Sequence, residues 1–160
     1  ETIIKIQSIF GDGVLNQNGT LNREALGVIV RRDKNARVRL EAVTHPAIRA
    51  EIARRVQEAA LAGAPAIFVE AALLVETGSA SLYPDLWVVR CDPQTQIERL
   101  MARNNCDRTT AEEWVATQMP VDEKVKHATV IIHNDGDLAS TLEQTNKAYA
   151  QFIEQQQGQD

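Results

Sequence analysis

The chain has 160 residues, of which 44% are hydrophobic and 24% charged, and its formal net charge is −5. This length is typical of a single globular domain that can bury a sizeable core. The negative charge argues against a nucleic-acid partner, since such proteins carry a basic surface, and no apolar run approaches the about 20 residues of a membrane-spanning helix.

Cysteine usage indicates the compartment. The chain has two cysteines, Cys91 and Cys106, which are too few for a disulfide framework. No signal peptide is evident at the N-terminus. Because free thiols are usual in a reducing environment, we expect a cytoplasmic protein.

The first third of the chain has a helical pattern. Apolar residues at helical spacing predict a short helix over Thr2–Phe10, which Gly11 ends. Thr20 or Asn22 can cap a second helix, and Asp33 can cap a third. We therefore expect a helical region before the first strand.

A proline divides the next helical pattern. The residue before a proline avoids the helical region, so His45-Pro46 predicts a break, with Pro46 in the first turn of a new helix. Gly63 is the expected end of that helix. On position alone, His45 is more readily explained as a helix cap than as a ligand-binding residue.

Three short apolar runs predict buried strands, at Ala66–Glu70, Leu86–Cys91 and Thr129–His133. Helical patterns separate them, which favours an α/β fold with a parallel sheet and helices on its faces. Ligands of such sheets bind beyond the carboxyl ends of the strands. Glu70 and Glu76 flank the carboxyl end of the first predicted strand. One of these carboxylates could order a metal-bound water or a substrate hydroxyl, and the other could simply face solvent.

The second half contains four helical patterns. Asp92-Pro93 starts one that runs to about Arg103, and Thr109 to Glu112 has the spacing of a capping box that opens the next. A short turn of helix follows over Val121–His127. Asp137 can cap the terminal helix, and the residues from Gln155 on are expected to be a frayed tail.

Several chemical motifs are missing from the sequence. None of the 8 glycines precedes a lysine, so these residues contain no Gly-Lys-Ser/Thr phosphate loop. The three histidines, His45, His127 and His133, lack the spacing of metal ligands, and we expect no metal site. No nucleophile elbow or Cys-His pair is evident.

Arginines are the main candidates for phosphate binding. Arg99 and Arg103 are four residues apart, on one face of a helix, and Arg108 follows in a loop. Arginine is a permanently charged, bidentate donor to phosphate, so the three could form a clamp. The spacing by itself favours a solvated surface, which is the commoner arrangement.

An ordered set of motifs resembles the dephospho-CoA kinase family of P-loop kinases from Ile6 to the terminal helix. The set comprises Ile9-Phe-Gly11, Asn18-Gly-Thr-Leu21, Arg23, Leu40-Glu41, Thr44-His-Pro46, Ile48, Leu73-Leu74, Glu76, Gln96, Arg99-Leu-Met-Ala-Arg103, Gln118-Met-Pro120, Lys124, Val130-Ile131, Asn134 and Gly136.

The resemblance implies phosphorylation of the ribose 3′-hydroxyl of dephospho-CoA by ATP with Mg²⁺. It implies a three-layer P-loop-kinase-like fold with a helical CoA-substrate domain at residues 1–63, a core at 64–98 and 128–160, and a lid at 99–127. Its site residues fall into three groups. They are Arg99 and Arg103 as catalytic, His45, Leu73, Leu74 and Glu76 as substrate-binding, and Asn134 and Gly136 as nucleotide-binding.

The sequence departs from the family in three places. Ala72 replaces the usual proline before the two leucines, and Thr129 replaces the usual aspartate. The family's first two strands, its P-loop and the Asp thought to act as base are absent. We therefore expect a fragment that alone neither holds ATP phosphates nor transfers them, and that could fill its missing central strand by strand swapping or homo-oligomerisation. The alternative is a non-catalytic nucleotide- or CoA-binding or regulatory protein.

Overall fold

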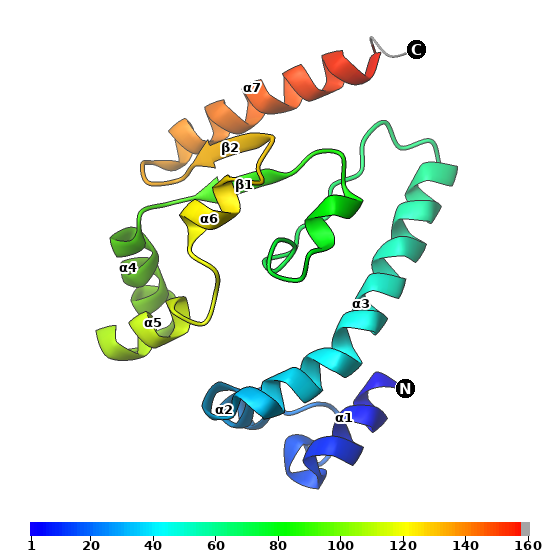
Figure 1. Cartoon of the computed structure of the whole chain (residues 1–160), viewed down its shortest axis with the longest axis vertical. Helices are drawn as coiled ribbons and strands as arrows, with labels where there is room; N and C mark the ends of the chain where they lie inside the picture. The colour runs from blue at the N-terminus through cyan, green and yellow to red at the C-terminus, as the bar shows by residue number, and fades with distance from the viewer. Residues whose placement is uncertain (158–160) are drawn as a thin grey trace. The chain divides into compact units, whose positions relative to one another are not determined.

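The computed structural model describes residues 1–157 and divides into two compact units, Glu1–Val69 and Glu70–Asp160. Figure 1 shows the first unit as helical and the second as a small sheet with helices. The domain boundaries at residues 63, 98 and 127 that the family resemblance implies stay predictions.

The first unit packs three helices, α1 (Thr2–Phe10), α2 (Arg23–Arg32) and α3 (Lys34–Leu61), with a 3₁₀ turn, η1, over Asp12–Val14. Their apolar faces meet in one core, as the helical spacing predicts. The buried residues of that core are Ile6, Val14 and Leu26, and Phe10, Leu21, Val30, Leu40 and Val43 pack against them.

The ends of these helices follow from local chemistry. Gly11 ends α1 with a φ of 79°, a conformation that a glycine adopts without strain. The side chain of Asn22 accepts a hydrogen bond from the Ala25 N–H at 3.0 Å, so Asn22 rather than Thr20 caps α2. Asp33 caps α3, as expected, by accepting from the Asn35 N–H at 2.8 Å.

The predicted break at His45-Pro46 is wrong, because α3 continues through Pro46 to Leu61. A proline inside a helix removes one backbone hydrogen bond and costs about 3 kcal/mol. Before it, Leu40 and Val43 hold the helix on the core of the unit. After it, Glu51 binds both Arg54 and Arg55 along the helix surface. Packing on the core before the proline, with a smaller contribution from the exposed pairs after it, keeps the helix continuous. The helix closes as predicted near Gly63, whose φ is 74°.

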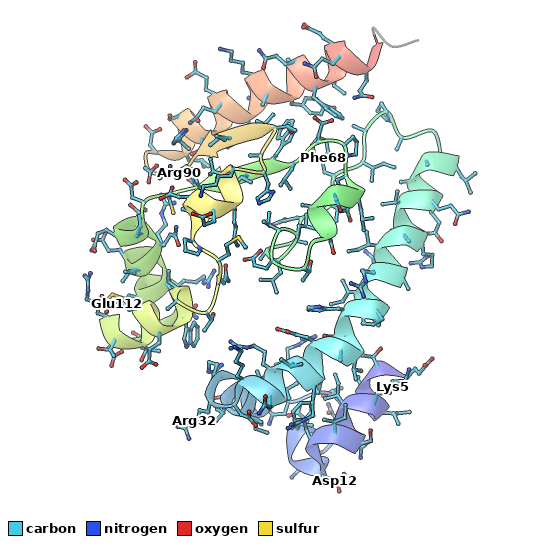
Figure 2. All side chains as sticks on the ribbon, in the orientation of Figure 1. Lys5, Asp12, Arg32, Phe68, Arg90 and Glu112 are labelled. Carbon is cyan, nitrogen blue, oxygen red and sulfur yellow. The ribbon has the colours of Figure 1, made fainter. Side chains whose placement is uncertain are left out.

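The predicted buried strand at Ala66–Glu70 is also not formed. Residues 64–71 have no regular secondary structure, and Ile67 and Phe68 are 38% and 57% exposed (Phe68 is labelled in Figure 2). An apolar run becomes a strand only where a second strand takes up its N–H and C=O groups. Among residues 1–157, no strand pairs with this segment.

The second unit contains one 3₁₀ turn, two strands and four helices in the described residues. In chain order they are η2 (Ser79–Leu82), β1 (Trp87–Arg90), α4 (Pro93–Asn104), α5 (Arg108–Val115), α6 (Val121–Val125), β2 (Val130–His133) and α7 (Leu138–Gln157). Residues expected to fray at the C-terminus are helical as far as Gln157, and the rest of that tail lies outside the described residues.

The two strands are parallel, with Trp87 opposite Val130 and Arg90 opposite His133. Side chains alternate between the faces of a strand. The ring of Trp87 packs edge-on against Phe152 of α7, whereas Arg90, on the other face, pairs with Asp122 of α6. Helices therefore cover both faces (Figure 1), and the expected α/β parallel architecture is confirmed for a sheet of two strands in the described residues.

Two helix starts in this unit can be compared with their predicted caps. The expected capping box at Thr109 is wrong: the cap is Asp107, two residues earlier, which accepts from the Thr110 N–H at 2.8 Å, and α5 begins at Arg108. Hydrogen bonding to Thr110 holds the pKa of Asp107 below its ordinary value, because it favours the charged carboxylate. Asp137 caps α7 as expected, accepting from the Ser140 N–H at 2.8 Å.

Candidate functional site

A compact turn over residues 72–78, here the 72–78 turn, follows the irregular apolar segment. The carbonyl of Leu73 accepts from both the N–H and the hydroxyl of Thr77, at 3.0 and 2.8 Å. The carbonyl of Leu74 accepts from the Ala80 N–H at 3.0 Å. These bonds present the side chain of Leu73 to solvent, where it is 37% exposed, while Leu74 is half-buried.

The carboxylate of Glu76 lies in the same turn and pairs with Lys124 of α6. The Lys124 Nζ is 2.6 Å from Glu76 Oε1, and it also donates to the carbonyl of Ala72 at 3.1 Å. Both side chains are largely buried, with 15% of Lys124 and 18% of Glu76 exposed. This distance is within hydrogen-bond range but the angles at the contact are not, so the contact is an ion pair, and neither oxygen of Glu76 receives a hydrogen bond of regular geometry from residues 1–157.

Arg99 and Asn134 come together at the carboxyl ends of the two strands. The Nη1 of Arg99, from α4, donates to the carbonyl of Asn134 at 2.6 Å. The Asn134 N–H donates to the carbonyl of Arg90 at 2.8 Å, which continues the sheet pairing into the loop. The structure therefore joins two residues that the sequence placed in different functional groups.

The loop of residues 134–136 is held from two further directions. The carboxylate of Asp135 accepts a short hydrogen bond from the Asp92 N–H at the start of α4. The hydroxyl of Thr141 donates to the Asn134 side-chain oxygen at 3.1 Å. Gly136 faces open space, with no atom within 4 Å of the position where a Cβ would lie. The loop thus combines a fixed backbone with a free approach at Gly136.

Cys91 lies beside this loop, at the end of β1. Burial raises the pKa of its thiol, Arg99 partly offsets that effect, and Asp135 and Asp92 add to it. A thiol with a raised pKa is a poor nucleophile at neutral pH. The thiol of Cys91 is therefore not an activated nucleophile.

The three candidate arginines have different partners in the structure. Arg99 binds the Asn134 carbonyl, and the Nε of Arg103 donates to the neighbouring Asn104 side chain at 2.9 Å. Arg108 binds Glu112 (labelled in Figure 2) at 2.7 Å and the side chain of Gln94 at 2.9 Å.

His45 lies half-buried in α3 of the first unit, beside Pro46. The other candidate residues all lie in the second unit. In residues 1–157, no three His, Cys, Asp or Glu side chains gather to hold a metal ion. No helix in the same range is both long and apolar enough to cross a membrane.

Sequence reasoning assigned no role to Lys124 and Asp135, although each contacts a candidate residue or its loop. Lys124 belongs to the ordered motif set, but nothing in its local sequence indicates a partner 48 residues away. Aspartate is common in turns, so the residue type of Asp135 gave no sign of its hydrogen bond to Asp92. Long-range contacts of this kind depend on the fold rather than on a local pattern.

Comparison with known proteins identifies the family. A profile of the dephospho-CoA kinase family matches residues 1–140. The chain is 44% identical over 131 residues to a dephospho-CoA kinase of Geobacter sulfurreducens, a match that covers 82% of this chain and 66% of that protein. It is 42% identical over 149 residues to a dephospho-CoA kinase of Geobacter metallireducens, covering 93% of this chain and 74% of that protein.

Solved structures agree with these matches. The structure of TT1252 from Thermus thermophilus superimposes with a TM-score of 0.76 and 31% identity, over 92% of this chain and 74% of that one. A dephospho-CoA kinase from Campylobacter jejuni gives a TM-score of 0.64 and 30% identity, over 94% and 75% of the two chains. The chain therefore belongs to the dephospho-CoA kinase family.

Proposed function

We propose that this chain provides the substrate-binding and nucleotide-facing parts of an enzyme that phosphorylates the 3′-hydroxyl of dephospho-CoA with ATP. Membership of the dephospho-CoA kinase family carries the proposal. The 72–78 turn supports it, because an exposed leucine stands there next to a carboxylate that accepts no hydrogen bond within the described residues.

The proposed substrate contacts are divided by chemistry. Leu73 and Leu74 give apolar contact to dephospho-CoA, and Glu76 accepts a hydrogen bond from it. His45, from the helical region at residues 1–63, adds a donor. The core is at residues 64–98 and 128–160. This assignment follows the positions that match the family's motifs.

The proposed nucleotide contacts come from the lid and from the 134–136 loop. Phosphoryl transfer requires positioning and charge neutralisation more than covalent chemistry. Arg103, in the lid at residues 99–127, neutralises charge on the transferred phosphoryl group. Asn134 and Gly136 face the adenine of ATP, where the open space beside Gly136 gives room for a ring. Arg99, the first residue of the proposed lid, is the second catalytic arginine, and it holds the 134–136 loop by donating to the Asn134 carbonyl.

We further propose that the 160 residues alone do not catalyse transfer. They contain no Gly-Lys-Ser/Thr sequence, and a P-loop kinase holds the ATP phosphates with the backbone and lysine of that motif. Substrate binding and transfer are thereby separable in this chain, because the proposed dephospho-CoA contacts are present.

The test uses the purified 160-residue chain. Calorimetric titration with dephospho-CoA should show saturable binding, which Leu73→Ala and Glu76→Gln weaken. Incubation with dephospho-CoA, ATP and Mg²⁺ should give no coenzyme A by mass spectrometry. Formation of coenzyme A would contradict the inactive state, and absence of dephospho-CoA binding would contradict the substrate assignment. Binding of other nucleotides with equal affinity would favour a non-catalytic binding protein.

A further inference from the structure

The Lys124 ammonium joins two points of the 72–78 turn. It lies 2.6 Å from Oε1 of Glu76 and donates to the carbonyl of Ala72 at 3.1 Å. These two points enclose Leu73 and Leu74. One ammonium from a distant helix thus fixes both sides of the pair of leucines that faces the proposed substrate.

The ion pair of Lys124 and Glu76 is more buried than the surface ion pairs of the chain. Lys124 and Glu76 are 15% and 18% exposed, whereas Lys126 and Glu123, in the same stretch of chain, are 65% and 53% exposed. Water and salt screen an exposed pair strongly and a buried pair weakly. Removing one partner of a buried pair leaves the other uncompensated, so loss of Lys124 should act directly on Glu76.

The bonding of Glu76 argues against a purely stabilising role for the pair. A buried ion pair repays its desolvation cost only when its remaining polar atoms are hydrogen-bonded. Both oxygens of Glu76 are buried and lack such bonds within residues 1–157. The contact with Lys124 instead holds the carboxylate in one place.

We propose that Lys124 is a positioning residue, which holds the 72–78 turn in the shape that binds dephospho-CoA through its contacts with Glu76 and the Ala72 carbonyl. This inference rests on the proposed function, because it assumes that the turn contacts that substrate. Lys124 also lies within residues 99–127, so the same contact joins the proposed lid to the proposed substrate turn.

Three variants and one control test the proposal in the full 160-residue chain. Lys124→Met removes the charge but keeps the length of the side chain, Lys124→Arg keeps the charge, and Glu76→Gln keeps the shape of the carboxylate. Lys126→Met removes a lysine from the same stretch of chain, where it pairs with the exposed Glu123. Two quantities are measured: amide hydrogen exchange at Thr77 and Ala80 without ligand, and the Kd for dephospho-CoA.

We expect Lys124→Met to increase exchange at Thr77 and Ala80 and to raise the Kd, each by about tenfold, through local opening of the turn. Lys124→Arg should keep the exchange rates and the Kd close to those of the unmodified chain, and Lys126→Met should change neither quantity. The double variant of Lys124→Met with Glu76→Gln should lose less affinity than the sum of the two single losses, because the residues act as a pair. A merely structural role would lower the melting temperature without confining faster exchange to the turn.

Unchanged exchange and Kd in Lys124→Met would overturn the role of Lys124 while leaving the proposed function intact. Equal losses in Lys124→Met and Lys126→Met would also overturn it. If the unmodified chain does not bind dephospho-CoA, the proposed function and this inference both fail. If Lys124→Met does not fold, the remaining variants still test the coupling between Lys124 and Glu76. Unchanged affinity for dephospho-CoA in Glu76→Gln would overturn it. Additive losses of affinity in the double variant of Glu76→Gln with Lys124→Arg would also overturn it.

Discussion

The hydroxyl of Thr129 is bonded at the point where the sheet begins. It accepts a hydrogen bond from the Leu86 N–H at 2.9 Å, while the Thr129 N–H donates to the Leu86 carbonyl at 2.8 Å. The side chain and backbone of one residue thus hold the residue before β1. An aspartate, usual in the family at this position, also offers an acceptor there. The substitution therefore removes a charge but keeps the bond.

Thr129→Val should lower the free energy of unfolding by about 0.5–1.5 kcal/mol, since the valine keeps the shape but offers no acceptor to Leu86. Thr129→Asp should restore the acceptor and stay close to the unmodified chain. Urea denaturation of the three proteins measures the effect. Equal stability of Thr129→Val and the unmodified chain would show that solvent replaces this bond at no cost.

Single residues also mark where sequence reasoning reaches its limit. Asn22 and Asp33 could be recognised as caps because a cap bonds a backbone N–H two or three residues away. Lys124 could not be assigned its partners, because Glu76 and Ala72 come near it only after the chain has folded. The same holds for the bond of Arg99 to the Asn134 carbonyl.

At the scale of elements, α3 shows how tertiary contacts override a local signal. Pro46 predicts a break, yet the helix continues because its first half packs on the core of the first unit and its second half carries side-chain pairs. The segment Ala66–Glu70 shows the reverse. Its composition favours a strand, but a strand needs a partner, and none pairs with it in the described residues. β1 and β2 have that partner in each other, and both were predicted.

The charged pairs in the second half of α3 make that half sensitive to acid. Hydrogen bonds from Arg54 and Arg55 lower the pKa of Glu51 from 4.5 to about 2. A carboxyl group with a depressed pKa stabilises the fold above its unfolded pKa and loses that effect as the pH falls through the folded value. The contribution of Glu51 should therefore be complete above about pH 4.5 and lost near about pH 2.

Circular dichroism of the unmodified chain and of Glu51→Gln tests this. The unmodified chain should have more helix and a higher melting temperature above about pH 4.5, and the difference should shrink as the acid approaches about pH 2, because glutamine cannot titrate. Other carboxyl groups titrate alike in both proteins, so only the difference between them reports on Glu51. A difference that stays constant over this range would contradict the assignment.

At the scale of the molecule, the candidate residues are divided between the two units. His45 lies in Glu1–Val69, and Leu73, Leu74, Glu76, Arg99, Arg103, Asn134 and Gly136 lie in the other unit. The resemblance to the dephospho-CoA kinase family could be predicted from the sequence, because it depends only on which residues occur and in what order. The position of His45 relative to the other candidates depends on a geometry that no local pattern encodes.

Ligand binding provides a measurement on the whole chain. A ligand that binds only the folded state at about 100 times its Kd adds about 2.7 kcal/mol to the free energy of unfolding. Dephospho-CoA at that excess should raise the melting temperature by roughly 5–10 °C for a chain of this size. ATP at the same concentration should have little effect, since the residues contain no phosphate loop. If ATP raised the melting temperature more than dephospho-CoA does, the proposal that the chain mainly binds dephospho-CoA would be contradicted.

The parallel register of β1 and β2 also bears on how the second unit forms. Trp87 pairs with Val130, 43 residues further along the chain, and α4, α5 and α6 occupy the interval. Parallel strands cannot be joined by a tight hairpin, so the whole crossover must be gathered before the first strand contact is made. That closure costs chain entropy, whereas each helix needs only contacts within a few residues. The helices of the proposed lid can therefore form early, and the sheet edge that carries Asn134 is completed late.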